Sequence, residues 1–383
     1  MNVTLVADER AQAVATPSWR PRLLFVPVSG AYGMGEYARS LNLALACHAR
    51  WPDAGIHFIL SAQAQYAAGL RFEHTLLPSS PTFHTPEVVD VIQRFAPDIV
   101  IFDNAGRTAQ VSAARRAGAG AVYISARPRQ RRKAFRWRWM RMLDEHWIAY
   151  PQFMAGSLSA VERLKLHWAH RPQVRFLDCI LPQATPAQAT EVLARSGAAG
   201  TRFVLVVPGG GTGHPRVADA VSVFLSAARK LAARGIHTVF VAPAEASVEP
   251  GGNLCKMDVL PLAELLVLLR AARVVLTNGG DTLIQAIACG IPAVAVPIAK
   301  DQPARIARCV HAGVVRAETL SDEPMSAAVA ELFGETRARI DMQAYAQRLG
   351  LRDGLSESVD ALERLLRRRG APTSAWPSTD TDV

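Results

Sequence analysis

Short apolar runs rich in β-branched residues alternate with longer amphipathic stretches along most of this chain. The first run covers residues 23–28, and residues 36–50 follow it with the apolar spacing of a helix. Further apolar runs of this half cover residues 56–60, 97–103, 121–124 and 147–149. Strands that alternate with helices favour a parallel sheet covered by helices on both faces.

A second series of the same kind starts after a stretch rich in Pro, Ala, Thr and Gly. Its apolar runs cover residues 203–207, 238–241, 274–277 and 293–296. A chain of 383 residues exceeds the usual size of a single core, so two domains are expected. The predicted organisation is a flexible tail at 1–20, a first α/β domain at 21–180, a linker at 181–200, a second α/β domain at 201–340, C-terminal helices that pack back at 341–370, and a disordered tail at 371–383.

Composition narrows the setting of the protein. The five cysteines are scattered without a CxxC pair, so neither a disulfide framework nor a zinc site is expected. The first residues lack the apolar core of a signal peptide, and no apolar run approaches the ~20 residues of a membrane span. We therefore expect a reduced, cytoplasmic setting. The net charge of +10 favours anionic partners, although a general richness in arginine explains it equally well.

The first glycine-rich loop follows the first strand directly and contains Gly33, Gly35 and Glu36. It fits a loose form of the dinucleotide-binding fingerprint. That fingerprint also needs an acidic residue after the second strand, and residues 60–63 contain none, which disfavours a nicotinamide cofactor. Two interpretations stay open: a tight turn without a ligand, or an acceptor or phosphate site with Glu36 at its floor.

A second glycine-rich loop follows the strand at 203–207. It contains Gly209, Gly210, Gly211, Thr212, Gly213 and His214. Backbone N–H groups of such a loop suit a diphosphate, and the absence of a Gly-Lys-Ser/Thr ending disfavours ATP hydrolysis. His214 is either a phosphate donor or an ordinary turn residue.

A third group of polar and glycine residues follows the strands at 274–277 and 293–296. Its candidate ligand-binding residues are Asn278, Gly279, Gly280, Thr282, Gln285, Asp301 and Gln302. The glycines permit close approach of a backbone to an anion, and the polar side chains suit sugar and ribose hydroxyls. Asp301 can also act as the N-cap of the next helix. The ends of parallel strands meet in one crevice, so a nucleotide-sugar site is expected there.

A basic and aromatic segment lies between the two glycine-rich loops. Its candidate surface residues are Arg131, Arg132, Lys133, Arg136, Trp137, Arg138 and Trp139. Arginine with tryptophan suits an anionic membrane surface. The alternative is a solvated helix whose tryptophans belong to the core. The absence of a nucleic-acid-binding signature in the segment disfavours nucleic acid as a partner.

These motifs together resemble the GT-B glycosyltransferases, and the closest similarity is to the bacterial peptidoglycan N-acetylglucosaminyltransferase and UDP-glycosyltransferase group. The resemblance spans residues 22–370 and is most specific over 257–313. It implies two Rossmann-like domains that face each other across a cleft, with the C-terminal helix returning to the N-terminal domain. It also implies that the second domain binds the nucleotide-sugar, with Gln285 standing where the family normally has a ribose-binding Glu.

The resemblance implies inversion at the anomeric carbon when the sugar, expected to be UDP-linked, is transferred to a hydroxyl. We expect no metal or other cofactor, because the loop at 209–214 and the helix after Gly280 can stabilise the leaving diphosphate. We expect Glu36 to act as the general base, because burial can raise the pKa of a carboxyl enough for that role. The basic segment suggests a lipid-linked acceptor of a cell-envelope glycan and peripheral attachment to the inner face of the membrane. A UDP-sugar hydrolase of similar fold and a non-catalytic nucleotide-sugar-binding protein remain alternatives.

Overall fold

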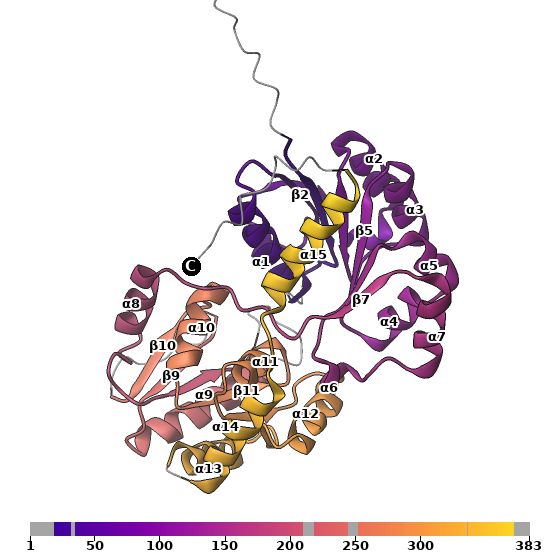
Figure 1. Ribbon diagram of the computed structural model, residues 1–383. Coiled ribbons are helices and arrows are strands. Elements are labelled where there is room, and N and C mark those ends of the chain that lie inside the picture. The colour runs from indigo at the N-terminus through magenta and orange to yellow at the C-terminus, as the bar shows by residue number, and fades with distance from the viewer. Residues whose placement is uncertain (1–18, 32–34, 210–217, 244–251, 335, 371–383) are drawn as a thin grey trace, which may run out of the picture.

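The computed structural model describes residues 19–31, 35–209, 218–243, 252–334 and 336–370. Within these residues the chain forms two lobes, each built on a parallel sheet with helices on both faces (Figure 1). The predicted α/β fold with two Rossmann-like domains is confirmed. Residues 1–18 and 371–383, most of the two expected tails, lie outside the described residues.

The first sheet has seven parallel strands in the order β3-β2-β1-β4-β5-β6-β7. The strands are β1 (Arg22–Pro27), β2 (Gly55–Ser61), β3 (Glu73–Leu77), β4 (Ile99–Asp103), β5 (Gly120–Ser125), β6 (Glu145–Ile148) and β7 (Gln173–Phe176). The chain winds from β1 to one edge and then returns to build the other half from β4. The switch point between β1 and β4 opens a crevice at the carboxyl ends of the strands.

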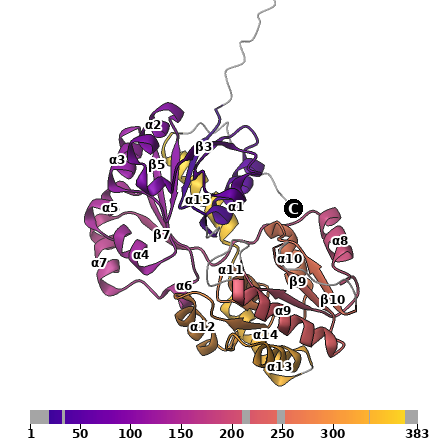
Figure 2. The same cartoon turned by 180° about the vertical axis from the view of Figure 1, so that it is seen from behind.

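Helices cover both faces of the first sheet (Figures 1 and 2). They are α1 (Gly35–Arg50), α2 (Thr85–Phe95), α3 (Thr108–Arg116), α4 (Pro128–Ala134), α5 (Trp137–Met142) and α7 (Ala160–Ala169), with short 3₁₀ turns at Gln65–Ala67 and Pro81–Phe83. Helix α6 (Gln152–Ala155) instead packs on the second lobe, where Met154 is buried. Alternate residues of β1 point to opposite faces, as the period of a strand requires. Leu23 and Phe25 pack into the core under α1, while Leu24 and Val26 pack into the core on the other face.

The second sheet has six parallel strands in the order β10-β9-β8-β11-β12-β13. The strands are β8 (Val204–Val207), β9 (Thr238–Val241), β10 (Leu254–Met257), β11 (Val274–Asn278), β12 (Ala293–Val296) and β13 (Arg316–Ala317). The helices of this lobe are α8 (Pro186–Arg195), α9 (Ala218–Ala233), α10 (Leu262–Ala271), α11 (Asp281–Ala288), α12 (Gln302–His311), α13 (Asp322–Phe333) and α14 (Arg337–Leu349). The switch point lies between β8 and β11, which brings their carboxyl ends together.

Helix α8 lies inside the segment expected to be a linker, residues 181–200. Thr185 caps this helix by accepting a hydrogen bond from the N–H of Gln188, and Pro186 occupies its first turn. Thr185 and Pro186, whose residue types are also common in loops, therefore mark the start of a helix. Val192 is buried in the core of the second lobe, so α8 belongs to that lobe.

The two C-terminal helices belong to different lobes. Within the expected returning segment, 341–370, the part in α14 stays with the second lobe, where Ala346 is buried. The last helix, α15 (Gly354–Arg368), crosses back and packs against α1 (Figure 1). Leu362 is buried in the core of the first lobe, and Glu363 pairs with Arg50 of α1 at 2.6 Å. The predicted return of the C-terminal helix is thus confirmed for α15.

The chain passes between the lobes at two points that lie side by side. Cys179 on the outgoing segment forms a parallel β-bridge with Asp353 on the returning one. The N–H of Gly354 donates to the carbonyl of Cys179 at 2.7 Å, and the N–H of Leu181 donates to the Asp353 carboxylate at 3.1 Å. The two crossings therefore form one hydrogen-bonded connection.

Candidate functional site

A cleft of about 660 Å³ lies between the lobes, at the carboxyl ends of strands from both sheets. The first two turns of α1 and the segments after β5, β6 and β7 line one side, and the segments after β8, β9, β10, β11 and β12 line the other. Helices α1, α11 and α12 all begin in this lining. The N-terminus of each helix carries a partial positive charge that favours an anionic ligand.

Asn278 connects the two switch-point strands of the second lobe. Its side-chain N–H group donates to the carbonyl of Pro208 after β8 at 2.7 Å. Its carbonyl oxygen accepts from the N–H of Gly280 at 2.6 Å, just before α11 begins. Asn278 is buried and lines the cleft. It therefore fixes the distance between two of the loops that were expected to hold a diphosphate.

The glycines around Asn278 make room for protein side chains. A Cβ on Gly209 would lie 1.8 Å from the Asn278 side-chain nitrogen, and the φ angle of Gly209 is +113°. A Cβ on Gly280 would lie 2.6 Å from the Asn278 oxygen, and one on Gly279 would lie 2.9 Å from the Cβ of Gln302. These glycines are needed for the packing of the loops themselves, which the sequence did not reveal.

Asp301 and Gln302 lie at the start of α12 and line the cleft. The Gln302 side-chain oxygen accepts from the N–H groups of Ile298 at 2.7 Å and Ala299 at 3.3 Å, so it stabilises the turn after β12. Asp301 occupies the N-cap position but makes no capping bond, and its carboxylate instead pairs with Arg305 at 2.9 Å. The alternative interpretation of Asp301 as an N-cap is therefore right for its position, but the side chain forms no capping bond.

Thr282 and Gln285 also line the cleft from the first turns of α11. Gln285 is buried, and its side-chain nitrogen donates to the carbonyl of Ile180 at 3.3 Å. Ile180 follows β7 of the first lobe, so this contact joins α11 to the segment between the lobes. A glutamate at this position would set a carboxylate against that carbonyl, which gives a structural reason for the amide.

Part of the candidate donor and acceptor loops falls on residues that the structure does not describe. These residues are Gly33, Gly210, Gly211, Thr212, Gly213 and His214. Gly35 and Gly209, which flank the two gaps, both line the cleft. The two glycine-rich loops therefore leave from the walls of the same cavity.

Glu36 lies in the first turn of α1, on the side of the cleft opposite α11. Its Oε1 accepts from the side-chain nitrogen of Asn104 at 2.9 Å and lies 3.7 Å from the guanidinium of Arg127. Asn104 follows β4 in the left-handed conformation, with a φ of +53°, and its side-chain oxygen accepts from the N–H of Ala126 at 2.8 Å. Asn104 thus orients Glu36 from the switch point of the first sheet.

A buried ion pair anchors the same helix. The guanidinium of Arg39 on α1 donates twice to the carboxylate of Asp103 at the end of β4, each time at 2.8 Å. Both side chains are buried. Burial lowers the pKa of Arg39, but the adjacent Asp103 carboxylate outweighs burial and raises the pKa, so the guanidinium is fully protonated. This pair sets the position of the α1 N-terminus and hence of Glu36.

Arg305 on α12 lines the cleft and connects the two lobes. It donates to the carbonyl of Gly279 and pairs with Asp301, and its guanidinium lies 4.4 Å from the ring centre of Tyr150 after β6. Burial raises the pKa of Tyr150, with a contribution from Asp281. Asp281 begins α11, and its carboxylate lies 3.7 Å from where a Cβ on Gly35 would stand.

Sequence reasoning missed several of the residues that organise this cleft. They are Arg39, Asp103, Asn104, Arg127, Tyr150, Asp281 and Arg305. Their positions in the sequence could have indicated three of them. Asp103 and Asn104 lie at the end of one strand and Tyr150 follows another, at the edge where ligands bind in such sheets.

The basic segment divides into structural and exposed residues. Arg131 is half-buried and pairs with Glu162 of α7 at 2.8 Å. Trp139 is buried and donates to the Thr108 hydroxyl at 3.1 Å, while the amine of Lys133 lies 4.1 Å from its ring centre. Burial, with nearby arginines, lowers the pKa of Lys133 to about 8. Arg131, Lys133 and Trp139 therefore hold this segment to the lobe and do not belong to a surface patch. Exposed members are Arg132, Arg136, Trp137 and Arg138.

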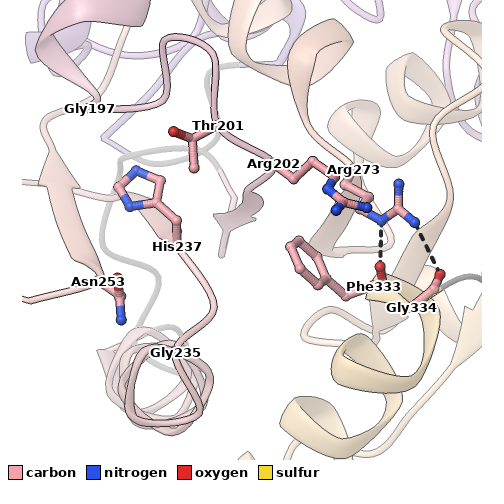
Figure 3. A pocket seen from close by; sticks show the side chains of 9 residues that line it. All are labelled: Gly197, Thr201, Arg202, Gly235, His237, Asn253, Arg273, Phe333 and Gly334. Atoms are coloured by element: carbon pink, nitrogen blue, oxygen red, sulfur yellow. Dashed lines mark hydrogen bonds between the residues drawn. The ribbon is translucent and has the colours of Figure 1, made fainter.

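A second hollow, of about 680 Å³, lies on the second lobe (Figure 3). Its lining residues are Gly197, Thr201, Arg202, Gly235, His237, Asn253, Arg273, Phe333 and Gly334. His237, Asn253 and Arg273 each directly precede a strand, so this hollow lies at the sheet edge opposite the cleft. The Arg273 guanidinium donates to the carbonyls of Phe333 and Gly334 at the end of α13. Arg273 therefore stabilises the end of α13, which is a structural role. We place the candidate site in the cleft between the lobes.

Among the described residues, no three His, Cys, Asp or Glu side chains are arranged to hold a metal ion. Across the same part of the chain, none of the helices has the length and apolar character needed to cross a bilayer.

No family model matches the chain. The zeaxanthin glucosyltransferase of Pseudescherichia vulneris is 31% identical over 103 residues, which are 25% of this chain and 24% of that protein. The match therefore spans about a quarter of that relative's length.

Solved structures are similar over nearly the whole chain. The calicheamicin glycosyltransferase has 19% identity and a TM-score of 0.60, with coverage of 92% of this chain and 100% of that one. A spinosyn rhamnosyltransferase complexed with thymidine diphosphate has 16% identity and a TM-score of 0.60, with coverage of 91% and 100%. A putative UDP-N-acetylglucosamine 2-epimerase from Listeria monocytogenes has 15% identity and a TM-score of 0.57, with coverage of 92% and 99%.

These similarities, together with the two sheets and the cleft between them, define the fold as that of the GT-B glycosyltransferases. The predicted fold class is confirmed. Because a putative epimerase shares the architecture, the fold by itself does not specify the reaction.

Proposed function

We propose that this protein is a glycosyltransferase that moves a sugar from a nucleotide-diphospho-sugar to an acceptor hydroxyl. The observation that carries the proposal is the arrangement of one cleft. The N-termini of α11 and α12 line one side, where they suit a diphosphate, and the Glu36 carboxylate lies on the other.

In the proposed step Glu36 accepts the proton of the acceptor hydroxyl while the acceptor oxygen attacks the anomeric carbon of the sugar. The bond between the anomeric carbon and the phosphate oxygen breaks, and the nucleoside diphosphate leaves with the bonding electron pair. Entry opposite the leaving group inverts the anomeric carbon. The helix N-termini stabilise the negative charge that develops on the diphosphate, so the proposed mechanism needs no metal.

The donor nucleotide is proposed to be uridine diphosphate, on the strength of the sequence resemblance. Asn278 and Arg305 hold the donor-side loops, and Thr282 offers a hydroxyl to the ligand. The spinosyn rhamnosyltransferase complex contains thymidine diphosphate, so both nucleotides belong in the test.

The acceptor is proposed to be lipid-linked, such as a precursor of a cell-envelope glycan, and to be met at a membrane surface. Support comes from apolar residues that line the cleft from both lobes. Leu41, Leu177 and Ile180 belong to the first lobe and the segment after β7, and Val259, Leu260 and Leu265 belong to the second lobe. Such walls favour an acceptor with an apolar part, because its transfer out of water stabilises binding.

The test is release of nucleotide diphosphate from UDP- and thymidine-diphosphate-linked sugars, each with and without a panel of lipid-linked acceptors. Glu36→Gln is expected to lower turnover at least about 10²-fold while donor binding persists. Glu87→Gln, which changes an acid on α2 outside the cleft, is the matched control and should be active. Near-normal turnover of Glu36→Gln would remove this residue from the mechanism.

The same assay separates the alternatives. A nucleotide-sugar hydrolase would release nucleotide equally well without any acceptor, an activity favoured by the occurrence of this fold outside the transferases. A non-catalytic binding protein would be stabilised against heat by the nucleotide-sugar but would release none. If no UDP- or thymidine-diphosphate compound raised the melting temperature, the nucleotide-sugar site itself would be refuted.

A further inference from the structure

Helix α7 presents an apolar face outward. Val161, Leu164 and Trp168 are 61%, 54% and 69% exposed. Their spacing of three and four residues places them on one side of the helix. No residue of α7 is buried, so the usual arrangement of a surface helix, with apolar side chains toward the core, is reversed.

Polar contacts hold α7 in this orientation. Ser159 caps the helix in a reciprocal pair with Glu162, and Glu162 also pairs with Arg131 of α4 at 2.8 Å. The amine of Lys165 donates to the carbonyl of Phe135 at 3.1 Å. The inward side of α7 is thus fixed by hydrogen bonds and ion pairs, and its apolar side is directed away from the lobe.

Helix α5 extends the apolar face. Trp137 is 42% exposed, and the Lys165 amine lies 6.0 Å from its ring centre, which places Trp137 beside α7. Figures 1 and 2 both show α4, α5 and α7 together at the outer edge of the first lobe, next to β7. We call the surface formed by Trp137, Val161, Leu164 and Trp168 the α7 face.

Positive charge surrounds the α7 face. Residues 127–143 contain eight Arg and Lys residues and neither Asp nor Glu. The exposed arginines of α4, α5 and α7 and their junctions are Arg129, Arg132, Arg136, Arg138, Arg141 and Arg163. The acid that lies in α7, Glu162, is already paired with Arg131. Tryptophan and leucine bordered by arginines match the interface of an anionic bilayer, where rings and aliphatic chains enter the headgroup layer and guanidinium groups bind phosphates.

We propose that the α7 face docks the protein on the surface of an anionic lipid membrane. Trp168, Leu164, Val161 and Trp137 enter the interface, and the surrounding arginines contact lipid phosphates. A nucleic-acid surface suits the arginines but offers no apolar layer for three side chains of one helix. A second copy of this chain would bring the same positive charges together, which opposes self-association.

The α7 face is connected to the cleft by a single short helix. Arg127 immediately precedes α4 and lies 3.7 Å from Glu36, while Arg131 in the same helix binds Glu162 of α7. Docking would therefore hold the acceptor side of the cleft close to the lipid surface. In this respect the inference builds on the proposed function, although membrane binding itself requires no turnover.

The experiment is sedimentation of the full chain with phosphatidylcholine vesicles, with and without phosphatidylglycerol, in the absence of any nucleotide-sugar. The wild type is expected to bind the anionic vesicles and to be released by salt. Leu164→Ser/Trp168→Ser should weaken binding at least about tenfold, since both side chains lose apolar surface for the interface. Arg136→Ala/Arg138→Ala should weaken it about fivefold for each arginine removed.

Leu76→Ser/Phe83→Ser is the matched control. Leu76 and Phe83 are 54% and 70% exposed, like Leu164 and Trp168, but lie on β3 and the 3₁₀ turn at Pro81–Phe83. This variant should bind vesicles as the wild type does, and circular dichroism of each variant checks that it is folded.

Several results would overturn the proposal. They are failure of the wild type to bind anionic vesicles, equal binding by the Leu164→Ser/Trp168→Ser variant, equal loss in the Leu76→Ser/Phe83→Ser control, and a dimer of the wild type that the α7-face variant abolishes. Nucleotide release in solution, measured without vesicles, tests the proposed function separately. Active enzyme without vesicle binding would refute the docking surface alone.

Discussion

Replacement of Asp103 by Asn provides the most demanding test of how the cleft is held. The substitution conserves shape but removes the charge that faces Arg39, and both side chains are buried, with 0% and 8% exposed. Two charge-assisted hydrogen bonds at 2.8 Å are weakened, and a guanidinium is left unpaired away from water. Breaking one side of such a pair typically lowers the free energy of unfolding by about 3–5 kcal/mol.

The assay is urea denaturation of the full chain, followed by tryptophan fluorescence and circular dichroism. Asp90→Asn is the matched control, because Asp90 pairs with Arg94 on the exposed surface of α2 and should cost less than about 1 kcal/mol. The double variant Arg39→Met/Asp103→Leu should recover part of the stability, since no unpaired charge remains. A loss for Asp103→Asn no larger than that for Asp90→Asn would refute the reasoning.

Three further predictions follow from the packing of the two lobes. Gly209→Ala should lower the free energy of unfolding by more than about 2 kcal/mol, because the φ of residue 209 is +113° and an added Cβ would lie 1.8 Å from the Asn278 side-chain nitrogen. Combination with Asn278→Gly should restore part of the loss. Gln285→Glu should cost about 1–3 kcal/mol by setting a buried carboxylate against the carbonyl of residue 180, and an unchanged urea midpoint would contradict this. Burial, aided by Arg131, lowers the pKa of His146 from 6.5 to about 3, so below pH 6.5 the unfolded chain binds a proton that the folded state excludes. The contribution of His146 to the free energy of unfolding is therefore full above pH 6.5 and falls by about 1.4 kcal/mol per pH unit as the pH drops toward 3. Urea titrations at several pH values should show a smaller slope for His146→Gln than for the wild type.

The sequence was sufficient for the interior strands and for the edge where the site lies. It did not reveal β3, β7, β10 and β13, the outermost strands of the two sheets, because they are less buried and carry no continuous apolar run. Buried strands such as β8 and β11 consist of continuous apolar residues, and polar or glycine residues follow each one at its carboxyl end. Helix α8 was mistaken for linker because its Pro and Thr signals also occur in loops. Its assignment depends on the burial of Val192 against the second sheet, a contact that no local pattern encodes.

The hydrogen bonds that organise the cleft could not be predicted either, because they join residues that lie far apart in the sequence. The contact of Asn104 with Glu36 spans 68 positions, and that of Gln285 with Ile180 spans 105. The periodicity of α7 likewise indicates that one side is apolar but not which way that side points. Its outward direction follows from the Glu162–Arg131 pair, which requires the folded lobe.

The return of α15 to the first lobe has a consequence for folding during synthesis on the ribosome. Leu362, Leu365 and Leu366 complete the core over α1, so the first lobe lacks part of its interior until the last helix has been synthesised. By then the second lobe has all its strands and can already be folded. A fragment that ends after β7 would expose this apolar surface, whereas a circularly permuted chain that begins at α15 and continues into β1 should make the first lobe an uninterrupted unit.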